Sequence, residues 1–352
     1  MDHTPWMQRC LQLARNGADA VAPNPMVGAV LVQGERILAE GWHRAYGGPH
    51  AEVECLNAFG EGPVPKDAVM YVSLEPCTHH GRTPPCADLL IERGVEHVVV
   101  AHMDPFPEVC GRGIARLREA GIRVDIGLCE AEARWTNRRF LTSVEHQRPY
   151  IILKWARSAD GLLDRHPRDE RVVQRISSPI TDVLVHRWRS EEQAILVGSR
   201  TIVNDDPQLT TRLVEGRSPL RVVIDRNNTA PAGSKVFNAS ARTLLFTSSH
   251  RTDIEAEQVL LAFSENVLDR LMYELNARKI RSLFVEGGAE LLGHFLERGL
   301  WDEARVITGV AVFGAGTKAP SLRHIAVRTE RSDTDTVQCF TNTENPERSW
   351  YW

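Results

Sequence analysis

Apolar residues recur along this chain with two spacings, one typical of helices and one typical of strands. Residues 6–15 predict a helix with one buried face, because their apolar side chains lie at helical spacing. Two strands joined by a turn follow, and then strands alternate with helices. The strands are expected at 27–32, 36–40, 68–74, 96–101 and 122–126, and the helices at 50–56, 87–93 and 112–120. This alternation predicts a layered α/β domain.

A second α/β pattern follows a linker that we expect around residues 146–149. Its strands are expected at 150–156, 193–198, 220–225, 242–247, 282–286 and 303–309, and its helices at 179–189 and 289–298. The charged stretch 164–171 predicts an exposed loop. We therefore expect two domains, residues 1–147 and 148–352, which show no sequence repeat between them.

Composition narrows the class of protein. The 352 residues are 42% hydrophobic and 25% charged, which is typical of a globular protein. A net charge of −4 argues against a nucleic-acid surface. No apolar stretch has the length of a membrane span, so we expect no membrane partner. An odd number of cysteines, seven, and the lack of a signal-peptide pattern predict a cytoplasmic protein.

Three potential metal ligands stand in two short motifs. His50 begins a His-Ala-Glu triplet, and Cys77 and Cys86 each follow a proline. One imidazole and two thiolates are typical zinc ligands, and three protein ligands leave the fourth tetrahedral position open for water. Glu52 lies two residues from His50, close enough to carry protons without binding the metal. Zinc-dependent nucleobase deaminases combine a His-x-Glu motif with a cysteine pair in this way.

Two other interpretations of these motifs exist. A closed structural zinc site would require a fourth ligand, and buried cysteines can act as small apolar residues. The proline before each cysteine and the His-x-Glu triplet favour the catalytic site. Both ligand segments are expected at helix starts, with His50 in the first turn of its helix, where the helix dipole favours thiolate.

A second candidate site lies where a predicted strand runs into glycines and then a helix, at residues 285–290. A helix N-terminus of this kind can bind phosphate, although a tight turn without a ligand fits the pattern equally well. None of the predicted strands is followed by the dinucleotide-binding motif Gly-x-Gly-x-x-Gly. Residues 197–201 and 204–207 predict another polar loop after a strand.

Longer motifs resemble one known family closely. The run Ser73–Cys86 (SLEPCTHHGRTPPC) is far more specific than the general deaminase signature, and it occurs with NPMVGAV at 24–30 and Asp104-Pro105. These motifs resemble the bifunctional deaminase-reductases of riboflavin biosynthesis. The motifs KWARSADG at 154–161, NDDPQLTTR at 204–212 and VEGG at 285–288 resemble the reductase half of that family. The resemblance covers nearly the whole chain.

The resemblance implies a fold and two consecutive reactions. Residues 1–147 would form a cytidine-deaminase-like three-layer α/β/α domain, and residues 148–352 a dihydrofolate-reductase-like α/β domain. The first would use one zinc ion to deaminate 2,5-diamino-6-ribosylamino-4(3H)-pyrimidinone 5′-phosphate. The second would use NADPH to reduce the ribose of the product to a ribityl chain. The resemblance also implies a homo-oligomer whose partner is a small phosphorylated pyrimidine.

The resemblance assigns roles to individual residues. The metal ligands would be His50, Cys77 and Cys86, with Glu52 as the catalytic acid/base. Contacts to the deaminase substrate are implied for Asn24, His43, His79, Arg82 and Asp104, and the charged fork of Arg82 suits a phosphate. Contacts to the reductase substrate are implied for Lys154, Arg189, Leu209, Arg212 and Glu286. Cofactor contacts are implied for Ala156, Thr201, Asp205, Gly288, Ala289, Glu290, Leu291, Leu292, Gly293 and His294.

Three residues depart from the family pattern. Phe106 stands where many relatives carry a substrate-contacting asparagine, and Val173 and Arg175 replace a Ser-x-Trp pattern. Two further hypotheses are kept beside the bifunctional enzyme, and the altered region at Val173 and Arg175 motivates the second of them. One is a nucleic-acid-editing deaminase, against which the eight-residue gap between the cysteines argues. The other is an active deaminase whose degenerate C-terminal half serves as a binding or oligomerisation module.

Overall fold

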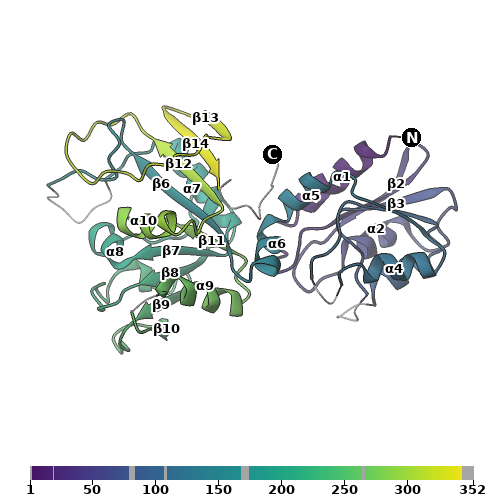
Figure 1. Ribbon diagram of the computed structural model, residues 1–352, viewed down its shortest axis with the longest axis horizontal. Coiled ribbons are helices and arrows are strands. Elements are labelled where there is room, and N and C mark those ends of the chain that lie inside the picture. Colours follow the sequence, from purple (N-terminus) through teal and green to yellow (C-terminus); the bar gives the residue numbers. More distant parts are fainter. Residues whose placement is uncertain are drawn as a thin grey trace. The chain divides into compact units, whose positions relative to one another are not determined.

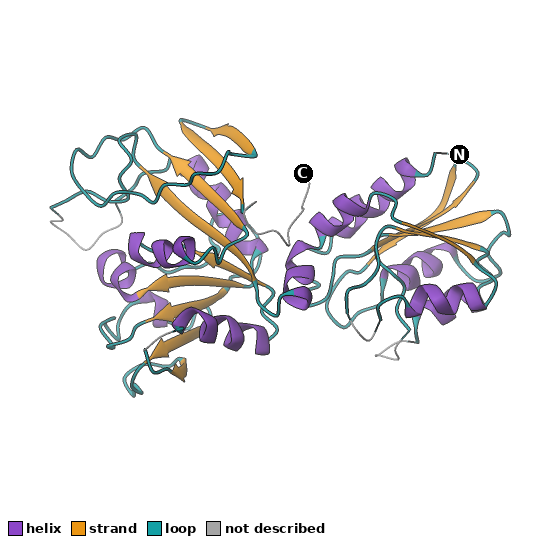
Figure 2. Cartoon of the chain, in the orientation of Figure 1, coloured by secondary structure: helices purple, strands orange, loops and turns teal. Residues whose placement is uncertain are grey.

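The computed structural model describes residues 2–18, 20–78, 84–106, 109–167, 174–263 and 266–342 (Figure 1). These residues form two compact units that meet in sequence between Gln147 and Arg148. Each unit has its own sheet, with helices packed on it (Figure 2). Within the described ranges, no helix is both long and apolar enough to cross a lipid bilayer.

The first unit is built on a five-stranded sheet with the order β2-β1-β3-β4-β5. Its strands are β1 (Gly28–Gln33), β2 (Arg36–Trp42), β3 (Ala68–Val72), β4 (His97–Val100) and β5 (Arg123–Ile126). Strand β1 runs antiparallel to β2 and β3, whereas β3, β4 and β5 are parallel. The carboxyl ends of β3 and β4 therefore share one edge, with Val72 opposite Val100. Residues that follow these two strands meet at that edge.

Helices cover both faces of this sheet. They are α1 (Thr4–Arg15), α2 (Ala51–Phe59), α3 (Cys86–Glu92), α4 (Arg112–Glu119), α5 (Glu130–Thr136) and α6 (Arg138–Glu145). Side chains of α2, α3 and α4 form a core with Leu31 and Met70 on one face, while α1 and α5 pack against Val30 and Tyr71 on the other. Because neighbouring strand residues point to opposite faces, each strand contributes to both cores. The result is a three-layer α/β/α unit (Figure 1).

The second unit contains a nine-stranded sheet with the order β10-β9-β8-β7-β11-β6-β12-β14-β13. The strands are β6 (Tyr150–Arg157), β7 (Ala194–Gly198), β8 (Leu220–Ile224), β9 (Thr243–Thr247), β10 (Glu257–Leu260), β11 (Ser282–Val285), β12 (Glu303–Thr308), β13 (Arg328–Ser332) and β14 (Asp335–Thr341). Strands from β10 to β12 in this order are parallel, and β14 and β13 continue the sheet as an antiparallel pair. The helices are α7 (Pro179–Glu191), α8 (Ser199–Asp205), α9 (Val267–Ala277) and α10 (Ala289–Glu297), with a 3₁₀ turn at Lys235–Phe237.

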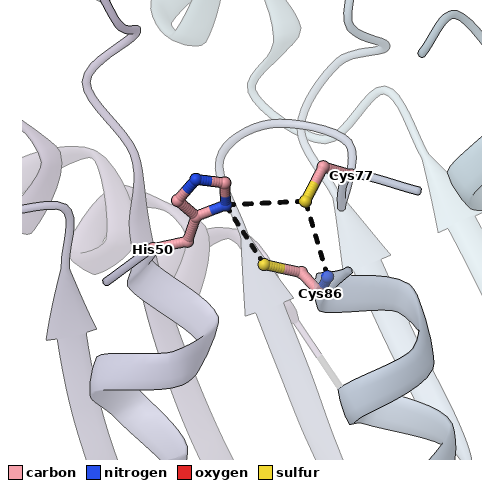
Figure 3. Close-up of side chains that lie close together, drawn as sticks. All are labelled: His50, Cys77 and Cys86. Atoms are coloured by element: carbon pink, nitrogen blue, oxygen red, sulfur yellow. Dashed lines mark hydrogen bonds between the residues drawn. The ribbon is translucent and has the colours of Figure 1, made fainter. Parts of the chain in front are cut away.

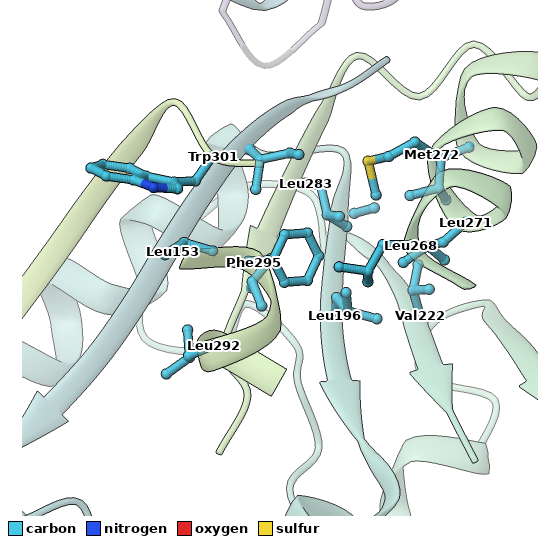
Figure 4. Close-up of a cluster of buried hydrophobic side chains, with 14 of the residues drawn as sticks. Leu153, Leu196, Val222, Leu268, Leu271, Met272, Leu283, Leu292, Phe295 and Trp301 are labelled. Carbon is cyan, nitrogen blue, oxygen red and sulfur yellow. The ribbon is translucent and has the colours of Figure 1, made fainter. Parts of the chain in front are cut away.

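Two apolar cores hold this second sheet between its helices. One joins α9 and α10 to the sheet, with Phe295 between strand residues such as Leu153 and Leu283 (Figure 4). The other packs Val185 and Trp188 of α7 against the opposite face. Burial of large apolar side chains at roughly 25 cal/mol per Å² is the main favourable term here. Because β6, β7, β8 and β11 are parallel, their carboxyl ends lie along one edge of this sheet.

Most predicted elements occur within a few residues of the expected bounds, and several corrections are informative. Of the predicted polar loops 197–201 and 204–207, residues 199–201 and 204–205 belong to helix α8, in which only Ile202 is buried. His50 precedes α2 instead of lying in its first turn. Of the predicted exposed loop 164–171, residues 164–167 lie outside helices and strands, and the rest fall outside the described residues. The sequence pattern missed α5, α6, α9, β10, β13 and β14.

Candidate active sites

His50 and Glu52 are positioned by the start of α2. His50 is the N-cap residue with an extended backbone (φ −74°, ψ 167°), and Glu52 lies in the first turn. The helix lies directly on β2, because a Cβ atom on Gly41 would come within 2.3 Å of the Cys55 amide nitrogen. Glu52 is only 3% exposed. Burial, acting against the favourable charge of His50, raises the pKa of the Glu52 carboxyl to about 7.

Cys77 and Cys86 complete a cluster with His50. Cys77 lies in the loop after β3, and Cys86 is the first residue of α3. The Nδ1 atom of His50 is 3.5 Å from Cys77 Sγ and 3.3 Å from Cys86 Sγ (Figure 3). All three ligand atoms lie within 4.8 Å of one another, and within the described ranges no fourth histidine, cysteine or carboxylate joins them. The cluster fits a zinc site with one position open.

The surroundings of Cys77 favour its thiolate form. The Cys86 thiol, His50 and the Cys86 backbone amide all hydrogen-bond to its sulfur, and together they outweigh burial and lower the pKa of Cys77. The amide nitrogen of Cys86 donates to Cys77 Sγ at 3.4 Å. Because a zinc ligand must be deprotonated, these donors prepare the sulfur for a metal ion. The donor set therefore fits zinc.

Asn24 and His43 lie beside this cluster. His43 Nδ1 is 2.8 Å from the carbonyl oxygen of Pro49. A carbonyl can only accept, so Nδ1 carries the hydrogen, and Nε2 accepts from the Asn24 amide at 3.2 Å. Burial lowers the pKa of His43, which keeps the ring neutral. The rings of His43 and His50 lie edge to face, with their centroids 5.6 Å apart.

Asp104 follows β4 and reaches the same edge of the sheet. It is 9% exposed, and its Oδ1 accepts the amide of Phe106 at 2.9 Å. Phe106, one of the departures from the family pattern, is 37% exposed. His79 and Arg82 lie outside the described residues.

Glu75 is a buried residue that the sequence predictions missed. Its carboxylate accepts the amides of Asp104, Gly111, Gly113 and Ile114 at 3.2, 3.0, 2.9 and 3.3 Å. Since Pro76 and Cys77 follow directly, Glu75 fixes the Cys77 loop to the start of α4. A signal for this role is present in the sequence. Glu75 follows an apolar strand, and Gly111 and Gly113 stand at a later helix start, where free N–H groups favour a carboxylate.

The second unit contains a cavity of about 1160 Å³ at the carboxyl ends of its parallel strands. All five predicted contacts to the reductase substrate line it: Lys154, Arg189, Leu209, Arg212 and Glu286. Eight predicted cofactor contacts also line it: Ala156, Thr201, Asp205, Gly288, Ala289, Glu290, Leu291 and His294. Leu292 is buried in the apolar core of α10, and Gly293 is not among the lining residues.

A buried carboxylate organises the positive charge of this cavity. Arg189 binds Glu286 through two hydrogen bonds of 2.7 and 2.8 Å, and Lys154 Nζ lies 3.7 Å from the same carboxylate. Burial alone would raise the pKa of Glu286, but Arg189 and Lys154 outweigh burial and lower it to about 2. The carboxylate is therefore charged and holds both cations in place.

His186 is a cavity-lining residue that the sequence predictions missed. Its Nδ1 accepts the backbone amide of Arg212 at 2.9 Å. Burial, and then the charges of Arg189 and Arg212, lower the pKa of His186 to about 4, so the ring is neutral. It therefore fixes the backbone at Arg212. Its place on a mainly apolar helix face gave no sign of this contact.

The glycines before α10 and the departure at Arg175 also lie at this cavity. A Cβ atom on Gly287 would come within 2.6 Å of the Leu291 side chain, whereas one on Gly288 would extend into open space. Gly288 is the N-cap of α10, where backbone N–H groups can face an anion. Arg175 pairs with Asp182 at 2.8 Å, and both line the cavity. Val173 lies outside the described residues.

Comparison with known proteins agrees with this arrangement. Residues 1–102 match the family model of the cytidine and deoxycytidylate deaminase zinc-binding region, and residues 149–339 match the RibD C-terminal domain. The chain is 40% identical over 318 residues to the riboflavin biosynthesis protein RibD of Aquifex aeolicus, covering 88% of each chain. Against RibD of Escherichia coli it is 38% identical over 343 residues, covering 91% of this chain and 92% of the relative.

Solved structures give the same result. A deaminase/reductase from Thermotoga maritima superposes with a TM-score of 0.87 at 35% identity, covering 96% of this chain and 98% of the other. RibD of Acinetobacter baumannii superposes with a TM-score of 0.86 at 32% identity, with the same coverage. The predicted fold class, a deaminase-like domain followed by a dihydrofolate-reductase-like domain, is confirmed. The chain therefore belongs to the RibD family, the bifunctional deaminase-reductases of riboflavin biosynthesis.

Proposed function

We propose that this protein deaminates 2,5-diamino-6-ribosylamino-4(3H)-pyrimidinone 5′-phosphate in its first unit. The second unit then reduces the ribose of the product to ribityl, giving 5-amino-6-ribitylamino-uracil 5′-phosphate. The observation that carries the first step is the convergence of His50, Cys77 and Cys86 beside the buried Glu52. The cavity around Glu286 supports the second step.

In the deaminase site, Glu52 moves the protons. Zinc bound by the three-residue cluster supplies Lewis-acid chemistry that makes water a nucleophile near neutral pH. Glu52 takes a proton from the attacking water and passes it to a ring nitrogen. It then carries the second proton, from the hydroxyl newly bonded to the ring carbon, to the leaving ammonia. Asn24, His43 and Asp104 orient the pyrimidine. We assign His79 and Arg82 to the substrate as well, on the family motif alone, with Arg82 on the phosphate.

In the reductase site, the chain supplies positioning and charge. NADPH supplies the hydride that reduces the ribose. The N-terminus of α10 at Gly288, with Thr201 and Asp205 of α8, holds the cofactor. Lys154, Arg189 and Arg212 bind the phosphorylated substrate, and Glu286 orders the first two of these cations. The retention of this paired charge set favours an active reductase over a degenerate module.

A two-signal assay tests the proposal. The purified protein, given the diamino substrate and NADPH, is expected to release ammonia first and then to oxidise NADPH, one equivalent of each per substrate. Ammonia release without NADPH oxidation, together with NADPH binding, would instead support the degenerate module. Absence of ammonia release by a zinc-loaded protein would refute the deaminase assignment.

We further propose a homo-oligomer in the cytoplasm. All seven cysteines are free thiols, as expected in a reducing compartment. The family resemblance supports self-association. Light scattering of the purified protein at several concentrations tests self-association, and a mass equal to one chain at every concentration would contradict it.

A further inference from the structure

Asn137 lies between α5 and α6 and faces a loop more than one hundred residues earlier in the chain. It is 2% exposed. Its Oδ1 accepts the Met26 amide at 2.8 Å, and its Nδ2 donates to the Met26 carbonyl at 2.9 Å. Both backbone polar groups of Met26 are therefore paired with one side chain.

The position of Asn137 makes this pairing unusual. Asn137 is the N-cap residue of α6, where an asparagine side chain ordinarily accepts a hydrogen bond from its own helix. Here the side chain makes no capping hydrogen bond. Both polar groups of the amide bond to Met26 instead, so the side chain joins the start of α6 to the loop and does not cap its own helix.

Met26 belongs to the segment that carries Asn24 to the zinc cluster. The segment after Met26 is fixed by the His43 amide, which donates to the Val27 carbonyl at 2.9 Å, and by the Gly28 amide, which donates to Ser73 Oγ at 3.0 Å. Residues 25–27 lie in no helix or strand, so side-chain contacts determine their course.

A continuous series of hydrogen bonds then leads from this segment to the metal ligand. Asn24 donates to His43 Nε2, and His43 Nδ1 donates to the carbonyl of Pro49. Pro49 directly precedes His50, the N-cap of α2. A shift of the loop at Met26 would therefore move Asn24 away from His43 and from the open side of the cluster.

We infer that Asn137 is a positioning residue for the deaminase reaction, acting through Met26 to hold Asn24 at the pyrimidine. The inference rests on the proposed deaminase function and deepens it. Asn137 touches no ligand itself. Its effect is expected on productive substrate binding, because a misplacement of about 1 Å remote from the chemistry can cost about a hundredfold in rate.

The test compares Asn137→Ala with Asn57→Ala, a matched control on the exposed side of α2. We expect Asn137→Ala to lower kcat/KM for deamination by about tenfold or more, mainly through a higher KM. Zinc is expected to stay at one per chain, and the reductase rate with supplied deaminated product to stay within about twofold. Deamination kinetics like those of the control would overturn the inference, as would a loss of activity that follows loss of zinc.

A double-mutant cycle with Asn24→Ala tests the route. If Asn137 acts through Asn24, then Asn137→Ala has little further effect when Asn24 is already alanine, whereas additive effects would overturn the inference. Should Asn137→Ala fail to fold, Asn137→Asp keeps the acceptor for the Met26 amide and sets a second oxygen against the Met26 carbonyl. Unchanged deamination in Asn137→Asp would also overturn it.

Hydrogen exchange at the Met26 amide provides a measurement that needs no substrate. We expect faster exchange in Asn137→Ala than in the wild-type protein, and equal exchange would contradict the loop contact. If the wild-type protein releases no ammonia while the exchange result holds, the proposed function fails and the positioning of the loop stands. If the wild-type protein is active and Asn137→Ala matches it, the inference alone fails.

Discussion

Two buried glutamates, Glu75 and Glu286, have their carboxyl oxygens bonded by different kinds of group. Glu75 accepts three backbone N–H groups at the start of α4 and the N–H of Asp104, whereas Glu286 lies between Arg189 and Lys154. A buried carboxylate needs such partners, because its desolvation is costly. Each glutamate therefore fixes its neighbourhood, Glu75 around the proposed zinc ligand Cys77 and Glu286 around the cations of the reductase cavity.

At the residue scale, Glu52→Gln tests the proton carrier. The amide keeps the shape of the side chain but cannot accept and return a proton, so ammonia release should fall by about 10²–10⁴-fold. Zinc content and reductase activity should remain, because the glutamate is no ligand of the cluster. Steady-state ammonia release and metal analysis measure both effects. Ammonia release that survives the substitution would remove Glu52 from its assigned role.

Glu286→Gln tests the charge of this buried carboxylate through the pH dependence of the free energy of unfolding. The pKa of Glu286 is lowered to about 2 from its usual 4.5, so its contribution to stability is present above about pH 4.5 and is lost as the pH falls toward 2. The variant leaves two cations uncompensated and should lower the free energy of unfolding by about 3–5 kcal/mol near neutral pH.

Urea unfolding of the wild-type protein and the variant between neutral pH and about pH 3 measures this difference. The gap between the two proteins should narrow as the pH falls, while acid effects on the zinc cluster affect both alike. Glu297→Gln, on an exposed position of α10, is the matched control. A gap that stays constant with pH would contradict the assigned charge state.

The candidate site was predictable where one residue type suits one chemistry. His50, Cys77, Cys86 and Glu52 were identified from short motifs, since few side chains other than these bind zinc or shuttle its protons. Glu75, Asn137 and His186 were missed. Their roles depend on backbone groups distant in sequence, and a single sequence does not reveal such pairs.

At the element scale, close approach of helices to neighbouring chain segments locates the zinc ligands. A Cβ atom on Gly113 of α4 would come within 1.9 Å of the Pro76 carbonyl oxygen. The absence of a side chain at this position lets α4 support the loop that carries Cys77. The same helix start supplies amides to Glu75.

Gly113→Ala should therefore weaken zinc binding. The added methyl group must displace Pro76 and with it Cys77, and a loss of support around a metal ligand typically costs about 10–100-fold in affinity. Competition with a chromogenic chelator measures the zinc dissociation constant. Gly233→Ala, where a Cβ atom meets only open space, is the control. Equal zinc affinity in the two variants would show that this contact has no role.

Elements with strong periodicity or long apolar runs were predictable, and those shaped by tertiary contacts were not. The buried strands β6 and β7 appear as apolar runs in the sequence. In contrast, β13 is largely exposed and, among the strands that the structure describes, pairs with β14 alone, so its residues carry little apolar signal. The short helix α8 was predicted as loop because its polar residues face a cavity instead of a core.

At the scale of the whole molecule, each unit contains its own core and its own site. The zinc cluster belongs to residues before Gln147, and the Glu286 cavity to residues after Arg148. Separate cores mean that damage to one site need not unfold the other unit. The two activities should therefore be separable by substitution.

Cys77→Ser tests this separation. A serine hydroxyl is a poor zinc ligand, so zinc content and ammonia release should both be lost. NADPH oxidation should continue at about the wild-type rate when the deaminated product is supplied directly. Simultaneous loss of both activities would indicate that the two units do not function independently.

The most direct test of the account is a zinc titration of the metal-free, full-length protein. Ammonia release from the diamino substrate should rise in proportion to added zinc and stop rising at one equivalent per chain. The reductase rate with supplied product should stay constant throughout. Full ammonia release by the metal-free protein, or a protein that binds one zinc and releases none, would contradict the central claim that His50, Cys77 and Cys86 hold a catalytic zinc ion.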